Sequence, residues 1–366
     1  MNVKYSIILV LVMLITLVLQ SNSQGLSVYQ DYLNKVYIFD NGTTKQIDHL
    51  PLNSFKIGNN AIAYEDNAGN FKIYQNNYVF SVSSFVSEYY TSDNLISFRL
   101  NSQLKVFDNQ QNKSLTTNVG AFACSDDIIV FFEKQERILK AYFNGNLYEL
   151  ADAIAADDIS DFVVGEDIAV FKNPEGYYDI FYYGEIIQLL FHERTKSFKT
   201  GRGIVAFIEE PMNNFQVFYQ GEFFELDTFE PKSYKTGDNM VAYVDNNGYL
   251  MCYYYGEKIT ISFDVPIFYE VHDDLIIFNV QNYFKVFSGG NVYTLESYIP
   301  EKYLFNNNIL AYIDEHGYLK VFEDGKVNTV SYELIKDFEI HGDVVNFKYG
   351  VQSQSMYYKG KTYTNN

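Results

Sequence analysis

Tryptophan is absent from this chain of 366 residues, cysteine occurs only twice and proline six times. A chain with so little cysteine depends on packing rather than on disulfides for its stability. Cys124 and Cys252 fall in different repeat units and in non-equivalent strands, so no disulfide between them is predicted. Cys252 takes a position where other copies of the repeat have valine or isoleucine, which indicates a small buried hydrophobe.

Basic residues are also scarce. The 27 Lys and Arg residues stand against 46 Asp and Glu residues and give a formal net charge of −19. Nucleic acids and anionic membrane surfaces both require a basic patch, so neither is predicted as a partner. The acidic charge need not indicate any partner at all. We favour the explanation that it only keeps the protein soluble.

Recognisable catalytic and metal-binding motifs are missing as well. No histidine has another histidine or a cysteine two or four residues away, so a zinc site has no support. The Asp- and Asn-rich turns lack the length and the terminal glutamate of a calcium loop. There is no Gly-rich phosphate loop and no Gly-x-Ser-x-Gly elbow. We therefore predict no catalytic residue, no metal and no cofactor, and the residues of any binding site are unknown from the sequence. The histidines are His49, His192, His272, His316 and His341.

Long apolar runs are absent except at the N-terminus. Lys4 precedes the apolar stretch 5–19, and small residues follow at Ser21 and Ser23. This order is typical of a secretory signal, predicted here as 1–23 with cleavage before Gln24. An uncleaved membrane anchor is the alternative, although the apolar stretch is shorter than the roughly 20 residues of a spanning helix. No membrane span is predicted in the mature chain, 24–366.

The mature chain repeats a unit of about 35 residues, of which 237–261 is one copy. Two aromatic anchors mark each unit. The first anchor is Tyr64, Phe98, Phe131, Phe171, Phe207, Tyr243, Phe278, Tyr312 and Phe347. The second anchor is Tyr74, Phe107, Tyr142, Phe181, Phe218, Tyr253, Phe287, Phe322 and Tyr357. Two independent anchors that keep one period indicate a solenoid, a propeller or an array.

Each unit predicts four short strands. The stretch 239–245 is apolar on both of its alternating faces, so we expect this strand to be covered on both sides. The turns at 219–222 and 245–248 contain the Asx and Gly residues that hairpins require. A leading strand such as 233–237 precedes the first anchor. Four antiparallel strands followed by a longer link are typical of a propeller blade.

The predicted fold is therefore all-β, a β-propeller of about nine to ten four-stranded blades. The first copy, within 24–50, lacks the leading strand, which leaves one ring, two smaller rings and an open array as alternatives. We prefer a ring because it leaves no exposed edges. The segment 149–161 lengthens one link and could form a helical turn. The repeat register predicts a hairpin at 132–142 despite its helical charge spacing.

The repeat resembles β-propeller proteins in general over residues 26–366. It lacks the Gly-His and Trp-Asp marks of WD40 blades, the Tyr-Trp-Thr-Asp mark of receptor propellers and the Asp-box of sialidases. The signal ending in Ser-Asn-Ser-Gln and the Asn-, Tyr- and Lys-heavy strands without Trp look like exported envelope proteins of Bacteroidota-type bacteria. That resemblance implies a periplasmic, outer-membrane-associated or extracellular protein, an accessory part of outer-membrane, secretion or gliding machinery.

Two functions fit these observations. The first is a non-catalytic binding or scaffolding module with a protein or glycan partner in the cell envelope. The second is a polysaccharide-acting hydrolase or lyase whose carboxylates meet at the mouth of the channel. Aromatic rings beyond the anchors serve packing between blades or form a ring-lined face for sugars or peptides. Carboxylates at points where the repeat breaks are candidates for the hydrolase: Glu209, Glu210, Asp152, Asp157 and Asp158.

Overall fold

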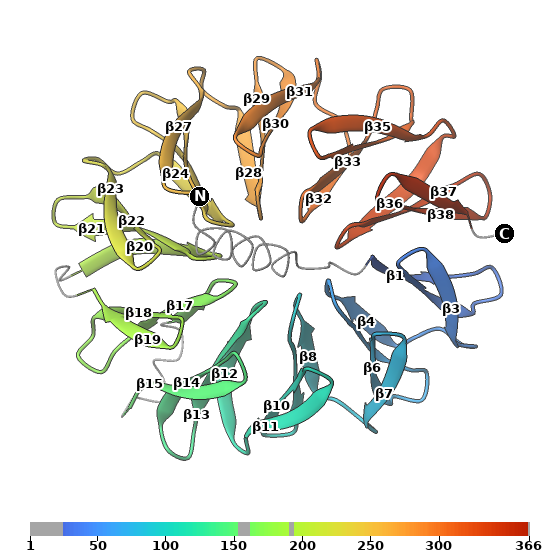
Figure 1. Ribbon diagram of the computed structural model, residues 1–366, viewed down its shortest axis with the longest axis horizontal. Coiled ribbons are helices and arrows are strands. Elements are labelled where there is room, and N and C mark those ends of the chain that lie inside the picture. The colour runs from blue at the N-terminus through green and yellow to red at the C-terminus, as the bar shows by residue number, and fades with distance from the viewer. Residues whose placement is uncertain (1–24, 153–161, 190–193, 365–366) are drawn as a thin grey trace, which may run out of the picture.

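The computed structural model describes residues 25–152, 162–189 and 194–364, and all of their regular secondary structure is β. Ten antiparallel sheets are arranged around a central channel as a closed ring (Figure 1). The predicted class and the preference for one ring are therefore confirmed. No helix in the described part of the chain is long and apolar enough to cross a membrane. The predicted signal 1–23 and residues 153–161 of the long link lie outside the described residues.

The strands follow one another blade by blade. The first blade consists of β1 (Leu26–Gln30), β2 (Val36–Asp40) and β3 (Thr43–Asp48). Blades two to five consist of β4 (Ser54–Ile57), β5 (Ile62–Glu65), β6 (Phe71–Gln75), β7 (Tyr78–Ser83), β8 (Glu88–Thr91), β9 (Ile96–Leu100), β10 (Gln103–Asp108), β11 (Gln111–Thr116), β12 (Val119–Cys124), β13 (Ile128–Glu133), β14 (Ile138–Phe143), β15 (Asn146–Ala151), β16 (Phe162–Val164), β17 (Ile168–Lys172), β18 (Tyr178–Tyr182) and β19 (Glu185–Gln188). Blades six to ten consist of β20 (Arg194–Gly201), β21 (Ile204–Glu210), β22 (Asn214–Tyr219), β23 (Glu222–Asp227), β24 (Ser233–Gly237), β25 (Met240–Val244), β26 (Leu250–Tyr254), β27 (Glu257–Ser262), β28 (Phe268–His272), β29 (Leu275–Val280), β30 (Tyr283–Ser288), β31 (Asn291–Glu296), β32 (Tyr303–Asn306), β33 (Ile309–Ile313), β34 (Leu319–Glu323), β35 (Lys326–Ser331), β36 (Ile335–His341), β37 (Val344–Tyr349), β38 (Ser353–Tyr358) and β39 (Lys361–Thr364).

Each sheet is a meander in which consecutive strands pair, so the order within a blade is the order in the chain. The leading strand of a full blade lies nearest the channel, as β4, β8, β28 and β32 do in Figure 1. The first blade has three strands because it lacks this leading strand, as the sequence predicts. The hairpin predicted at 132–142 is confirmed, since β13 and β14 pair directly.

The second strand of a blade is covered on both faces. In β25, Val241 and Tyr243 pack with the preceding blade, while Met240 and Ala242 pack with the following one. All five residues of β25 are buried. Burying apolar area at about 25 cal/mol per Å² makes this interblade packing the main stabilising contribution. Cys252 is fully buried on the neighbouring strand, and both cysteines are free thiols, as expected.

The aromatic anchors join successive blades. Tyr243 lies opposite Tyr234 across β24 and β25, and its ring also contacts Phe215 of the preceding blade with ring centroids 5.2 Å apart. Edge-to-face pairs of this kind add about 0.5–1.5 kcal/mol beyond the area that they bury. The same contact recurs between Phe71 and Phe98. The predicted role of the anchors in packing between blades is confirmed by these contacts.

Hydrogen bonds from second-anchor tyrosines also cross between blades. Tyr74 Oη donates to Asp40 Oδ2 of the preceding blade at 2.7 Å, and Tyr142 Oη donates to Asp108 Oδ2 at 2.6 Å. The acceptor in each pair is a buried carboxylate at the end of the next-to-last strand of its blade, β2 or β10. A charged acceptor makes these bonds worth about 1.5–3 kcal/mol each. They therefore fix the spacing of neighbouring blades at the outer part of the ring.

The ring closes by packing of the first blade on the tenth. Tyr358 Oη donates to Asn41 Oδ1 at 2.8 Å, and Phe39 packs against Tyr358 and Met356 in one buried cluster. On its other side the first blade shares a buried cluster with β5 and β6. No strand is exchanged between the two ends of the described chain, since β1 to β3 form a separate sheet from β36 to β39.

Candidate functional site

The site lies at one end of the channel, where turns join the first strand of each full blade to the second. These inner turns are short, with two to four residues between the strands. Asn239, Asp273 and Asn307 have positive φ values in their turns, a conformation that Asx residues tolerate well. The inner turns thus point a set of polar side chains toward the channel axis. Their carboxylates are Asp93, Asp126, Asp127, Glu166, Asp167, Asp238, Asp273, Asp274 and Asp343.

Glycine at the end of several leading strands lets these turns approach one another. A Cβ on Gly201 would lie 2.1 Å from the carbonyl oxygen of Gly237, and a Cβ on Gly237 would lie 2.3 Å from that of Asp273. Gly58 makes the same close approach to the backbone of Ser92. The Gly in the leading-strand sequences is therefore required by contact between blades, not by a left-handed φ.

Arg202 is the centre of the site and contacts four carboxylates from three other blades. Its Nη2 lies 3.0 Å from Asp126 Oδ2 and its Nη1 lies 2.8 Å from Asp127 Oδ2. Its Nε lies 2.7 Å from Glu166 Oε2 and 3.4 Å from Asp238 Oδ2. One guanidinium charge cannot balance four carboxylates. The group keeps a negative excess that protons or an incoming cationic group would compensate.

The acidic surroundings raise the pKa of several of these carboxyls. Burial, followed by the charges of Asp126 and Asp273, raises the pKa of Asp93 to about 7. Burial, followed by the charges of Asp238 and Asp273, raises the pKa of Asp274 to about 6. Burial also raises the pKa of Glu166, and the charge of Asp238 adds to that shift. Near neutral pH the site therefore binds protons that an exposed cluster would release.

In blades whose inner turn has no charged residue, Asn side chains take the equivalent position and belong to the site. Asn307 Nδ2 donates to Asn59 Oδ1 at 3.1 Å and to Asp343 Oδ1 at 2.8 Å. Asn59 Nδ2 in turn donates to Asp93 Oδ2 at 2.5 Å. These bonds bridge the position where the first blade has no leading strand. Together with the Arg202 group they surround a cavity of about 690 Å³, which Tyr255 also lines.

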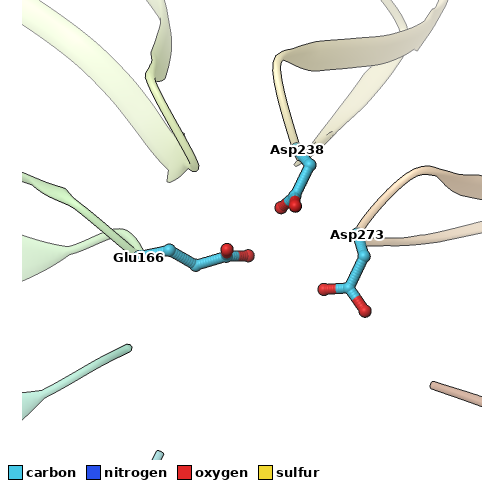
Figure 2. A group of neighbouring side chains, drawn as sticks. All are labelled: Glu166, Asp238 and Asp273. Carbon is cyan, nitrogen blue, oxygen red and sulfur yellow. The ribbon is translucent and has the colours of Figure 1, made fainter. Parts of the chain in front are cut away.

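Three carboxylates at this end have the spacing of a possible metal site. One oxygen each from Glu166, Asp238 and Asp273 lies within 4.8 Å of the others, and the three side chains point toward one another in Figure 2. Arg202 Nε, however, already contacts two of the three. The guanidinium supplies positive charge where a metal would have to lie, so we assign no metal to this group. The absence of a metal stays the prediction made from the sequence.

The carboxylates singled out from the sequence lie elsewhere. Glu209 and Glu210 end β21, at the opposite end of that strand from Arg202, and Asp152 follows β15 in a link on that same side. None of these three takes part in the channel-mouth group, and Asp157 and Asp158 lie outside the described residues. The sequence does contain a signal for the true cluster. Asp and Glu recur at one phase of the repeat, directly after the leading strand, and Arg202 replaces Asx at that phase.

The histidines also follow the turn geometry. His272 Nδ1 lies 2.8 Å from Asp273 Oδ2 at the channel mouth. The hydrogen bond to Asp273 raises the pKa of His272. His341 Nε2 lies 3.3 Å from Glu339 Oε2 on β36. Among the described residues, neither histidine belongs to the group of three carboxylates, and the absence of a zinc site stays a prediction.

Comparison with known families matches residues 20–363 to the 10-bladed beta propeller domain. No curated protein matches the chain. Among solved structures, the computationally designed Ika8 protein is similar at 15% identity and a TM-score of 0.33, over 75% of this chain and 96% of that one. The CRINKLY WD40 ectodomain of the receptor kinase ACR4 from Arabidopsis thaliana is similar at 9% identity and a TM-score of 0.35, over 67% and 98%.

A third similar structure is PorZ of Porphyromonas gingivalis, a bacterial surface component of the type-IX secretion system. It is 12% identical with a TM-score of 0.26, over 93% of this chain and 58% of that one. At these identities and scores, we base no functional argument on any of the three structures.

Proposed function

The chain belongs to the family of 10-bladed beta propeller domains, and we propose that it is an exported, non-catalytic binding and scaffolding propeller of a Bacteroidota-type cell envelope. In this proposal it is an accessory part of an outer-membrane, secretion or gliding machinery. Its acidic channel mouth binds a basic segment of a partner protein. The observation that carries the proposal is the excess of carboxylates over Arg202 in the inner turns.

The physics of the site favours a cationic ligand. Carboxylates gathered in a concave site with low-dielectric walls focus their field and raise the local concentration of positive groups. Asp238 Oδ1 and Asp274 Oδ1 are buried, and no group in the described part of the chain donates a hydrogen bond to either. Each can accept a bond from a Lys or Arg side chain, and charge-assisted bonds of this kind are about twice as strong as neutral ones.

The hydrolase alternative has less support from the geometry. A glycosidase needs one carboxyl held as a free acid and one as a free base or nucleophile on either side of a sugar. Glu166 and Asp238 both contact Arg202 Nε, which occupies the space between them. The ring of Tyr255 lines the same cavity but does not change that arrangement. Binding is the function that this arrangement supports best.

Titration of the intact protein with decalysine tests the proposal. We expect decalysine to bind with an affinity that falls as salt rises, because added ions screen the attraction. The double variant Asp274→Asn/Asp343→Asn removes two charges that do not contact Arg202. It should bind about tenfold more weakly, since each near-surface charge pair contributes roughly 0.5–1 kcal/mol.

The matched control is Glu315→Gln/Glu333→Gln, which loses the same net charge from exposed positions at the opposite ends of the blades. It should bind decalysine as the unmodified protein does. Equal weakening in the control and in the channel-mouth variant would show only a general attraction to an acidic protein, and the proposed site would be wrong.

A further inference from the structure

A second cavity lies beside the channel mouth, over the first four blades. Its volume is about 860 Å³. Inner turns contribute Asn60, Asn94 and Asp127 to its lining, and outer turns between third and fourth strands contribute residues such as Asn109 and Asn144. The cavity therefore runs from blade to blade between two rows of turns. We call it the amide groove because most of its lining residues are Asn or Gln.

The charged groups of the amide groove are already paired. Lys113 Nζ donates to Asp108 Oδ2 at 2.9 Å and to Tyr142 Oη at 2.8 Å. Asp127 accepts from Arg202 at 2.8 Å and from Asn94 Nδ2 at 2.6 Å. Apart from Asp127, which shares Arg202 with three other carboxylates, the amide groove therefore offers neutral groups to a ligand. Leu95 is the only apolar side chain among the described residues that line it.

Turn geometry accounts for only some of these amides. Asn109 and Asn144 have positive φ values, which explains an Asn at those positions without any ligand. Asn60, Asn94 and Gln75 do not have positive φ values. Asn60 Nδ2 donates to Asn94 Oδ1 at 2.7 Å, so these two side chains form a row that continues to Asp127.

Gln75 gives an independent indication of a ligand. Its Oε1 is buried and has no hydrogen-bond donor in the described chain. Leaving a buried acceptor unpaired destabilises a fold, and native proteins keep few such groups without a reason. Gln75 lies at the end of β6, on the wall of the amide groove.

We propose that the amide groove binds a neutral, hydroxyl-rich glycan. Side-chain amides both donate and accept hydrogen bonds, as sugar hydroxyls do. A groove with paired charges gives no advantage to an ionic ligand, and a lining with one apolar residue gives little to an apolar peptide. The amides repeat from blade to blade, which suits a ligand that itself repeats. The amide groove adjoins the acidic channel mouth, with Asn60 and Asn94 lining both cavities, but it needs no basic group in the ligand.

The experiment is an array of neutral and acidic oligosaccharides and of peptides, probed with the intact protein, followed by calorimetric titration of the tightest neutral glycan. The binding should be nearly constant from about 0.1 M to about 1 M salt, where the Debye length falls from about 10 Å to about 3 Å. Gln75→Met keeps the length of the side chain and removes its amide. It should weaken binding about fivefold, the equivalent of one hydrogen bond.

Controls distinguish loss of glycan binding at the amide groove from loss of stability and from effects at the channel mouth. Gln75→Met should melt no lower than the unmodified protein, because the lost acceptor has no hydrogen-bond partner among the described residues. Gln103→Met, at the other end of β10 from Asp108, should leave glycan binding unchanged, as should Asp274→Asn/Asp343→Asn. Binding of no neutral glycan, binding only of acidic glycans or peptides, or equal loss in Gln103→Met would each overturn the proposal.

Discussion

Replacing Arg202 by methionine is expected to lower the free energy of unfolding by about 3 kcal/mol at neutral pH, because it leaves partly buried carboxylates without their counter-ion. Asp126, Asp127, Glu166 and Asp238 all contact this guanidinium. Methionine keeps most of the apolar stem of the side chain, so the loss measures the charge rather than the packing. Chemical denaturation of both proteins at one salt concentration gives the difference.

The loss should depend on pH in a defined direction. Burial, and then neighbouring charges, raise the pKa of Asp93 from 3.8 to about 7 in the folded protein. Between these values the folded state holds a proton that the unfolded chain has released, so the contribution of Asp93 to stability is lost as pH rises through about 7. Without Arg202 more carboxyls should behave in this way. The deficit of the variant should therefore shrink as pH falls toward about 5.

Arg99→Met is the matched control. Arg99 has nearly the same side-chain exposure as Arg202, 31% against 29%, but contacts one carboxylate, Glu88. A single near-surface pair contributes about 0–1 kcal/mol, so the control should lose no more than that. Equal losses in the two variants, or a loss at Arg202 that does not change with pH, would contradict the charge imbalance described for the channel mouth.

Replacing Gly201 by alanine is expected to destabilise the ring by about 3 kcal/mol or more, because a packed interior yields little to an added methyl group. The new Cβ would lie 2.1 Å from the carbonyl oxygen of Gly237, and the neighbouring atoms of that residue are also backbone. Relief would require the sixth and seventh blades to separate at the inner rim. Thermal denaturation monitored by circular dichroism measures the effect.

Gly69→Ala separates this clash from the ordinary cost of losing a glycine. Gly69 has a φ of +83° and nothing within 4 Å of the added Cβ. Its replacement should cost only the conformational strain of about 1–2 kcal/mol. If Gly201→Ala costs no more than Gly69→Ala, the close approach of the leading strands does not limit the ring.

The repeat made most of the fold predictable. Two anchors per unit, such as Tyr243 and Tyr253, mark the strands because an aromatic ring in a short apolar stretch has to be buried between sheets. The three strands of the first blade were also predictable. The sequence of this copy begins with the equivalent of the second strand of a full blade, so the leading strand is missing. The ring itself could only be preferred, because closure depends on the contact between Tyr358 and Asn41, which are far apart in the chain.

The channel-mouth site was not predicted, and the reason is physical. Asp126, Glu166 and Asp238 each stand in a hairpin turn, where an acidic residue is common for local reasons. They become one electrostatic group only when neighbouring blades pack around the channel and bring turns from three blades onto one guanidinium. The predicted candidates Glu209 and Glu210 broke the repeat more visibly, but they lie at the other end of their strand. Residues that break the repeat therefore indicated the site less well than acidic residues that recur at the same position of each repeat.

Site-specific photo-crosslinking in the native cell tests the central claim most directly. A photoreactive amino acid at Asn308, which lines the cavity at the channel mouth, is compared with one at Asn247, in an exposed turn at the opposite ends of the blades. We expect an adduct from Asn308 alone, and mass spectrometry should place the crosslink in a segment of a partner protein rich in Lys and Arg. Adducts only from Asn247, or adducts from Asn308 to segments without basic residues, would contradict the account.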